Sequence, residues 1–201
     1  MTFIAVSLPA RASRTINLIA LFLVLLTAGC SNIVSLTRDE PISEDYTKRT
    51  SGAYVDDGFI ETKTEVNLKK VDSRFKKAQV RVDSYTGVVL LTGNVPESDM
   101  RDLASDTVKK IRKVRSVHNE LKVSPPKSFS TRISDGWLKS KIATRLLFHR
   151  NIKSSRYHVV VNDGVIYLMG LSTRKNADLV VAAVQQSYGV QKIVRAFEYI
   201  D

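Results

Sequence analysis

The stretch that decides the fold reads Val159-Val160-Val161-Asn162-Asp163-Gly164-Val165-Ile166-Tyr167-Leu168-Met169. Two runs rich in β-branched residues flank an Asp-Gly pair. This pattern predicts a β-hairpin, because a type I′ turn needs positive φ at both of its central residues. A similar stretch occurs earlier, where Val80 to Asp83 turns through Ser84 to Gly87 into Val88 to Leu91. The chain therefore contains the same predicted hairpin twice.

The repeat extends beyond the hairpins on both sides. Asp57-Gly58-Phe59-Ile60 matches Asp135-Gly136-Trp137-Leu138 at an offset of 78, and the hairpins match at an offset of 77. Val114 to Leu121 matches Val190 to Phe197 at an offset of 76. Slowly drifting offsets indicate two copies of one module that differ by small loop deletions.

Each copy has the pattern helix, strand, strand, helix, strand. Apolar positions at helical spacing predict the helices, and an Asp at the start of each first helix, or the neighbouring Ser134, is the predicted N-cap. The predicted helices are Asp57 to about Val71, Pro96 to about Val114, Asp135 to about Phe148, and Thr173 to about Tyr188; the closing strands are Val117 to Val123 and Ile193 to Ile200. Because two amphipathic helices must bury their apolar faces on one side of a three-stranded sheet, we predict an α+β fold.

The N-terminal residues resemble an export signal. Arg11 and Arg14 precede an apolar core from Ile16 to Thr27, and the segment closes on Ala28-Gly29-Cys30. The core is shorter than the roughly 20 residues that span a bilayer. Its ending resembles a bacterial lipobox, which implies that Cys30 carries covalent acyl and diacylglycerol chains; a buried free thiol or an ordinary signal peptide are the alternatives. Ser31, in place of an aspartate, implies the outer membrane.

These features predict a lipid-anchored chain with two folded modules. The predicted parts are a signal peptide (1–29), a flexible tether from the lipidated cysteine (30–54), domain 1 (55–123), a Pro-containing linker (124–130) and domain 2 (131–201).

Charge is distributed unevenly between the two copies. Residues 30–126 hold 17 Lys and Arg against 15 Asp and Glu, whereas residues 127–201 hold 12 against 5. A basic excess attracts polyanions. For an exported protein, this favours anionic lipid, lipopolysaccharide or cell wall as the partner and argues against nucleic acid.

No residue pattern predicts catalysis or a metal site. His118, His149 and His158 fall in separate elements without Cys, Asp or Glu at ligand spacing. Asp56-Asp57 could form a metal pair, but helix capping explains it better. We therefore predict no enzyme activity, no metal and no cofactor other than the lipid on Cys30.

The first helix of the second copy is the candidate binding element. Leu138, Ile142 and Leu146 recur on one face, which we assign to the core. The predicted phospholipid-binding residues lie on the adjacent face: Trp137, Lys141, Arg145 and Phe148, with Ser140 and Thr144 as headgroup hydrogen-bonding partners. Trp favours the membrane interface, and Lys and Arg stems lie along apolar surface while their charges reach phosphates. The alternative is a half-buried Trp137 that closes the edge of the fold.

The element order, the glycines that bound each second strand and the closing Val114-x-x-Val117-x-Asn119-x-Leu121 resemble the BON domain family. Two BON domains behind a lipobox imply a non-enzymatic envelope lipoprotein, anchored in the outer membrane and facing the periplasm. The resemblance further implies binding to anionic, phosphatidylglycerol-like phospholipid through domain 2, enrichment at division sites, support of outer-membrane integrity and contact with the outer-membrane protein assembly machinery.

Domain 1 provides an internal comparison and an alternative function. Phe59 and Lys63 match Trp137 and Lys141, but Asn67 takes the place of Arg145. We therefore expect domain 1 to bind lipid weakly and to serve as a scaffold or docking domain. In the alternative, the chain is an adaptor for assembly proteins or cell wall, and uses its sheet faces or domain 1.

Overall fold

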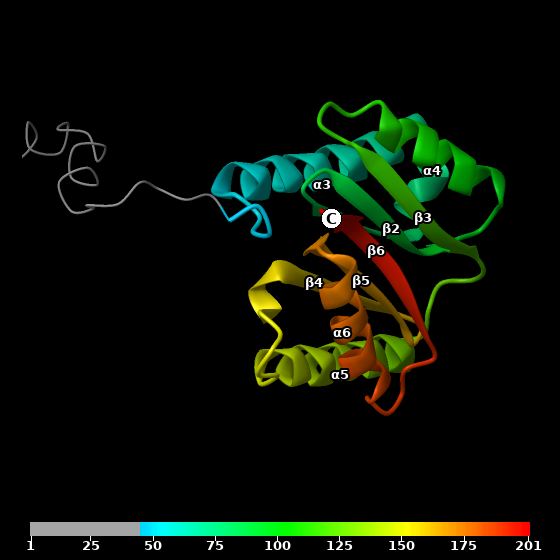
Figure 1. The fold of residues 1–201 in the computed structure, drawn as a ribbon. Coiled ribbons are helices and arrows are strands. Elements are labelled where there is room, and N and C mark those ends of the chain that lie inside the picture. The colour runs from blue at the N-terminus through cyan, green and yellow to red at the C-terminus, as the bar shows by residue number, and fades with distance from the viewer. Residues whose placement is uncertain (1–44) are drawn as a thin grey trace, which may run out of the picture. The chain divides into compact units, whose positions relative to one another are not determined.

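The computed structural model describes residues 45–201, which form two α+β modules of the same element order (Figure 1). The elements of domain 1 are α3 (Ser51–Val71), η1 (Ser73–Lys76), β1 (Gln79–Tyr85), β2 (Val88–Val95), α4 (Asp99–Lys109) and β3 (Ser116–Val123). The elements of domain 2 are α5 (Phe129–Leu147), η2 (Ser154–Arg156), β4 (Tyr157–Asn162), β5 (Val165–Ser172), α6 (Arg174–Gln185) and β6 (Lys192–Tyr199). The predicted α+β class and the internal repeat are confirmed.

Each domain has a three-stranded sheet with the hairpin at one side. The strand orders are β1-β2-β3 and β4-β5-β6; the first pair in each sheet is antiparallel and the second pair is parallel. Both central turn residues have positive φ in each hairpin: 50° and 79° at Thr86 and Gly87, and 53° and 66° at Asp163 and Gly164. The Asp-Gly prediction of a tight turn is therefore confirmed.

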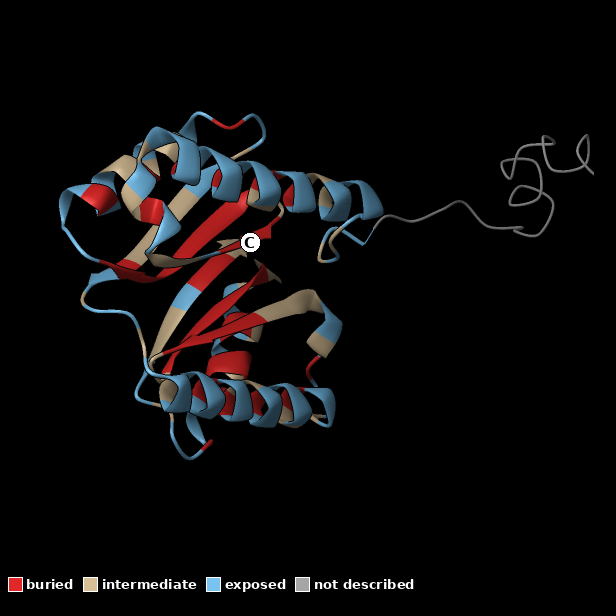
Figure 2. Cartoon of the chain, turned by 180° about the vertical axis from the view of Figure 1, so that it is seen from behind, coloured by how far each residue is buried: buried red, intermediate tan, exposed pale blue. Residues whose placement is uncertain are grey.

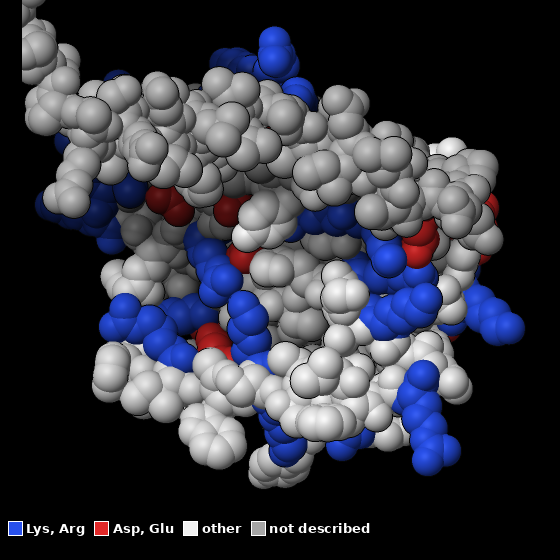
Figure 3. All heavy atoms as spheres, turned by 90° about the vertical axis from the view of Figure 1, so that its left-hand side faces the viewer, with Lys and Arg blue, Asp and Glu red and all other residues white. Residues whose placement is uncertain are grey.

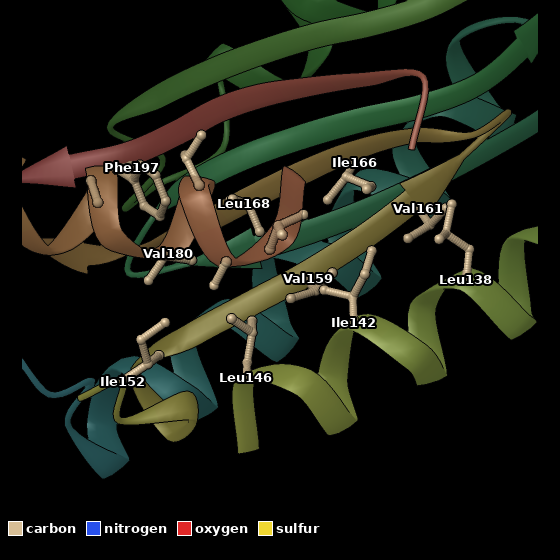
Figure 4. Close-up of a cluster of buried hydrophobic side chains, with 14 residues drawn as sticks. Leu138, Ile142, Leu146, Ile152, Val159, Val161, Ile166, Leu168, Val180 and Phe197 are labelled. Carbon is tan, nitrogen blue, oxygen red and sulfur yellow. The ribbon is translucent and has the colours of Figure 1, made fainter. Parts of the chain in front are cut away.

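The two helices of each domain cover one face of its sheet and enclose a core. In domain 2, Leu138, Ile142 and Leu146 extend from α5 toward β4 (Figure 4) and are at most 9% exposed. The matching core of domain 1 contains Ile60 and Leu68 of α3. The predicted core face of each first helix is thus buried.

The second faces of the two sheets pack against each other. Their buried side chains form a third apolar cluster, made of Tyr85, Val88, Leu90, Val160, Val165, Tyr167, Met169 and Ala196. Figure 2 shows the strands buried between the domains, while the outer faces of the helices are exposed. The Tyr85 hydroxyl also donates to the Arg156 carbonyl across this interdomain interface, at 3.0 Å. The expectation that an adaptor would use the sheet faces is therefore wrong, because they cover each other.

The first helix of each domain begins six residues before the predicted start. Thr50 caps α3 by accepting from the amide of Ala53 at 3.1 Å, and Ser128 caps α5 by accepting from the amide of Thr131 at 3.2 Å. The last four residues of the predicted tether and the last two residues of the predicted linker are consequently helical. The N-caps were misplaced because the capping hydroxyls precede the apolar repeat by more than a turn.

Asp57 and Asp135 are not N-caps. Both are buried inside their helices and accept from the backbone amides of the hairpin turns. Asp57 accepts from Thr86 and Gly87 at 2.7 and 2.8 Å. Asp135 accepts from the amides of the other hairpin, Asp163 and Gly164, at 2.9 and 3.0 Å. The side chains of Asp57 and Asp135 therefore hydrogen-bond each first helix to the turn of its hairpin.

The second helices are shorter than predicted. α4 begins at Asp99 and ends at Lys109, within the predicted span of 96–114. α6 begins at Arg174 because Thr173 is its N-cap, accepting from the amide of Asn176 at 3.3 Å. The apolar residues beyond α4, such as Ile111, still pack in the core of domain 1, which explains why the helical pattern looked longer.

The first described residues, 45–49, lie beside both domains. Asp45 pairs with Arg156 of domain 2 at 2.7 Å, and Arg49 pairs with the buried Asp57 at 2.8 Å. Residues 45–49 therefore contact both domains. The predicted signal peptide, Cys30 and residues 30–44 of the predicted tether lie outside the described residues.

Candidate functional site

The α5 helix presents a solvent-exposed face opposite its core face. Trp137 is 76% exposed and Phe148, the C-cap residue, is 78% exposed. The alternative of a half-buried Trp137 that closes the domain edge is therefore excluded. Ser140 and Thr144 are exposed on the same face.

Three exposed apolar residues on this face were missed by sequence reasoning. Phe129, Ile133 and Leu147 are 71%, 49% and 64% exposed. At about 100° per residue, they project near Trp137 on the helix. We call the full set the exposed stripe of α5: Phe129, Ile133, Trp137, Ser140, Thr144, Leu147 and Phe148. The spacing Phe129-Ile133-Trp137 could have revealed it, had the helix not been started at Asp135.

Basic side chains lie on both flanks of the exposed stripe. At about 100° per residue, Lys141 and Arg145 fall on one flank, and Arg132 and Lys139 fall on the other. Figure 3 shows Lys and Arg side chains gathered on the side of the molecule where α5 ends. Because sequence reasoning considered only the Lys141 flank, Arg132 and Lys139 were also missed.

The two predicted bases differ in their surroundings. Arg145 is partly buried, and its Nη1 donates to Oε1 of Gln186 on the α6 side at 3.1 Å. Lys141 is exposed, and its Nζ lies 5.7 Å from the ring centroid of Tyr188, which is itself 90% exposed. Lys141 is therefore the freer of the two charges.

A groove of about 700 Å³ runs beside Trp137 and Lys141. Its opposite wall includes Tyr188 and Gln191, which follow α6, and Lys122 from β3 of domain 1. The groove joins an aromatic rim to basic and amide side chains, and its lining also includes the carboxylates of Asp135 and Asp163. Lys122 is paired with Asp163 at 3.3 Å, so Lys141 is the base that can receive an anion. Such a combination suits an amphiphilic ligand whose polar group is anionic.

Two of the residues considered for catalysis or metal binding, His158 and Asp56, have structural partners. His158 Nε2 lies 2.9 Å from Oδ1 of Asp83, and Asp56 pairs with Lys113 at 2.6 Å. Burial opposes ionisation of Asp83, but the hydrogen bonds from His158 and Arg81 outweigh it and hold the pKa of this carboxyl below its usual value. Across residues 45–201, no group of three or more His, Cys, Asp or Glu side chains is arranged to hold a metal ion.

Two modules with this element order pack against each other through their sheets, and the first helix of each module has a solvent-exposed face. The molecule is therefore a tandem-domain protein. The chain belongs to the BON domain family, whose model matches residues 56–125 and 134–201.

Curated relatives share most of this length. The chain is 34% identical over 154 residues to the outer membrane lipoprotein DolP of Haemophilus influenzae, covering 76% of this chain and 79% of that protein. It is 25% identical over 152 residues to a 21 kDa hemolysin of Actinobacillus pleuropneumoniae, covering 76% and 78%. Among solved structures, the C-terminal domain of CdsD from Chlamydia trachomatis matches with 16% identity and a TM-score of 0.28, covering 72% of this chain and 67% of that one.

Proposed function

We propose that this chain is a non-enzymatic outer-membrane lipoprotein whose second BON domain binds anionic phospholipid through the exposed stripe of α5. The similarity to DolP, by its name an outer membrane lipoprotein, supports the location. The observation that carries the lipid proposal is the 76% exposure of Trp137 within an apolar stripe that has basic residues on both flanks.

The physical argument combines apolar burial with charge. Aromatic and aliphatic side chains that project from one helix face can enter the headgroup region together, as in helices that lie in the membrane interface. Each nearby Lys or Arg adds about 1 kcal/mol at an anionic surface. Lys141 projects within about 40° of Trp137 on the helix, so it can contact phosphates while Trp137 inserts. Arg132 and Lys139 project toward the other flank and line a different cavity.

In this proposal the membrane attachment has two parts. Acyl chains on Cys30 would provide the anchor, and the α5 surface would select anionic lipid, because stable attachment commonly needs two signals. No helix among residues 45–201 combines the length and the apolar character needed to cross a bilayer.

Vesicle co-sedimentation tests the lipid proposal. The chain from Ser31 onward contains all three apolar clusters and lacks the anchor, so its binding reports the folded surface alone. We expect it to sediment with phosphatidylglycerol vesicles and not with phosphatidylcholine vesicles. Trp137→Ala should weaken binding at least tenfold, whereas the matched change Phe59→Ala should not. Equal binding by Trp137→Ala and the parent would exclude the stripe.

The proposed cellular role is support of outer-membrane integrity, with enrichment at division sites. Anionic lipid binding would concentrate the protein where such lipids gather. In cells, Trp137→Ala should disperse a fluorescent fusion and increase sensitivity to detergent. If the Trp137→Ala fusion keeps the parent's position in the cell, localisation does not depend on lipid binding through the stripe.

A second candidate function is an adaptor for envelope-assembly proteins. The α3 helix of domain 1 also has exposed apolar side chains, including Tyr54 at 67%, Val55 at 54% and Phe59 at 59%. Photo-cross-linking from Phe59 in cells tests this function. Partners captured equally well after Lys141 is neutralised would favour the adaptor over lipid binding.

A further inference from the structure

A second cavity, of about 360 Å³, lies on the flank of α5 opposite the Lys141 groove. Its walls come from both domains. Domain 1 contributes Arg81 of β1, and domain 2 contributes Arg132 and Lys139 of α5 together with Asn162 of β4. Its volume falls within the range of about 300–1,000 Å³ that is typical of ligand sites.

Basic residues outnumber the acidic residue in the lining of this cavity. They are Arg81, Lys127, Arg132 and Lys139, and the acidic residue among the lining side chains is Asp135. Asp135 is already occupied, since it accepts from the hairpin amides and from Lys127 Nζ at 3.1 Å. Lys127 is 9% exposed and also contacts Asp163 at 3.0 Å, so it belongs to an internal ion cluster. Three charges therefore remain to face the cavity.

These three charges are incompletely paired. Within residues 45–201, neither Arg132 nor Lys139 has a carboxylate oxygen within 4.0 Å. Arg81 uses Nε and Nη2 to hold Asp83, at 2.8 and 3.1 Å, which leaves its Nη1 available. Burial, and then the charge of Arg81, lower the pKa of Lys139, while the charge of Asp83 opposes this shift. The cavity thus concentrates positive charge at a cost that a bound anion would offset.

Within residues 45–201, two buried amide atoms of this wall are also left without partners, the donor Nδ2 of Asn162 and the acceptor Oδ1 of Asn94. Asn162 is 6% exposed, and its Oδ1 accepts from Lys127 Nζ. Because an ammonium group can only donate, the amide oxygen must face Lys127. The other amide atom, Nδ2, is buried and has no hydrogen-bond partner in the described part of the chain. An acceptor oxygen seated against this wall would satisfy it.

We infer that the cavity between Arg81, Arg132 and Lys139 binds a phosphate group. The Arg132 guanidinium suits a tetrahedral oxyanion, because its planar N–H pairs can contact two oxygens at once. Arg81 can add its remaining Nη1, since Asp83 occupies its Nε and Nη2. Lys139 adds a third donor from the same side of α5. The phosphate can belong to a phospholipid headgroup or be free in solution, and the lipid source rests on the proposed function.

The position of the cavity has a consequence for how lipid would be held. A headgroup phosphate in this cavity and another in the Lys141 groove would lie on the two flanks of the exposed stripe. Since Arg81 belongs to domain 1, both domains are needed to complete the site. Domain 1 would therefore contribute to binding through its sheet edge rather than through α3.

Calorimetric titration of the chain from Ser31 onward, in phosphate-free buffer, tests the inference. The two probes are inorganic phosphate and a short-chain phosphatidylglycerol below its micellar concentration. The double variant Arg132→Gln/Lys139→Gln should weaken binding of at least one probe by tenfold or more. Lys69→Gln, an exposed lysine of α3, is the matched charge control and should leave both affinities unchanged.

Each outcome has a defined meaning. Loss of both probes in the double variant assigns a general phosphate site, and loss of the lipid probe alone assigns a headgroup site. Unchanged affinity for both probes in the double variant, or no binding of either probe by the parent, overturns the inference. Vesicle binding abolished by Trp137→Ala, with phosphate binding retained, would separate this cavity from the stripe. A parent that binds inorganic phosphate but no vesicles would contradict the proposed function alone.

Discussion

The α3 and α5 helices occupy the same place in their domains but present different surfaces. The exposed residues match in pairs at an offset of 78: Val55 with Ile133, Phe59 with Trp137, Thr62 with Ser140, and Val66 with Thr144. The helices differ at both ends. Ser51 and Lys70 of α3 stand where α5 has Phe129 and where Phe148 follows it. Only α5 therefore carries aromatic rings along its whole length.

The flanks of the two helices differ even more in charge. Glu61 of α3 takes the position of Lys139, and Tyr54 takes the position of Arg132. Glu61 accepts from the amide of Ser84 at 2.8 Å, and burial raises its pKa. One fold thus supports a helix with bases on both flanks and a helix with a base, Lys63, on one flank. The repeat fixes the backbone and the core face, while the solvent-facing positions are free to diverge.

The largest expected effect concerns the feature that both helices share, the buried aspartate under the hairpin turn. Asp57→Ala should lower the free energy of unfolding by about 3 kcal/mol, because it leaves a buried ion pair and turn amides without their partner. Asp135→Ala should cost somewhat less, since Asp57 also accepts from the Ser84 hydroxyl at 2.7 Å. Urea titration measures both. A cost below about 1 kcal/mol for either variant would mean that the turns hold without the carboxylate.

The aromatic ends of α5 should give the next largest effect. Phe129→Ser, which copies Ser51 of α3, should weaken binding to phosphatidylglycerol vesicles about tenfold, since burial of a Phe ring is worth about 1.5 kcal/mol or more. The reverse change, Lys70→Phe, should add little affinity to α3. Co-sedimentation measures both variants. If Phe129→Ser binds like the parent, the exposed stripe does not extend to the start of α5.

Lys141 of α5 and Lys63 of α3 occupy matching positions, and their loss should affect vesicle binding differently. Lys141→Gln should weaken vesicle binding about fivefold at low salt, as expected for about 1 kcal/mol at an anionic surface. Arg145→Gln should have a smaller effect, because its guanidinium is held by Gln186. Lys63→Gln in α3 is the matched control and should have none. An equal loss in Lys63→Gln would show that net charge, rather than position, controls binding.

The smallest expected effect lies in the interdomain interface, where Asp83 of β1 matches Val160 of β4. A carboxyl whose pKa is lowered in the folded state stabilises the fold above its unfolded pKa of about 3.9, and this contribution is lost as pH falls through the folded value. Asp83→Asn should therefore cost about 0.5–1 kcal/mol at pH 7 and nothing near pH 2. Urea midpoints at both pH values test this. A difference that persists unchanged at pH 2 would assign the effect to packing.

Much of the fold could be predicted from local pattern. The Asp163-Gly164 turn, the alternation of the strands and the core face of α5 depend on periods of 2 and 3.6 residues, which are visible in sequence. The helix starts were misplaced, since Thr50 and Ser128 stand apart from the apolar repeat. This error removed Phe129 and Ile133 from the predicted binding face. The exposure of Trp137 was left open because an aromatic residue beside a core stripe can pack or project.

The sequence by itself determined the repeated α+β module, the buried face of each helix and the basic excess of the second copy, because these follow from residue spacing and composition. It also placed Trp137, Lys141 and Phe148 near one another. Only the tertiary structure decided that the two sheets cover each other, that Asp57 and Asp135 hold the hairpin turns, and that Arg81 and Lys139 line one cavity between the domains. Such contacts join residues 28 or more positions apart, and neither helical nor strand periodicity carries information about them.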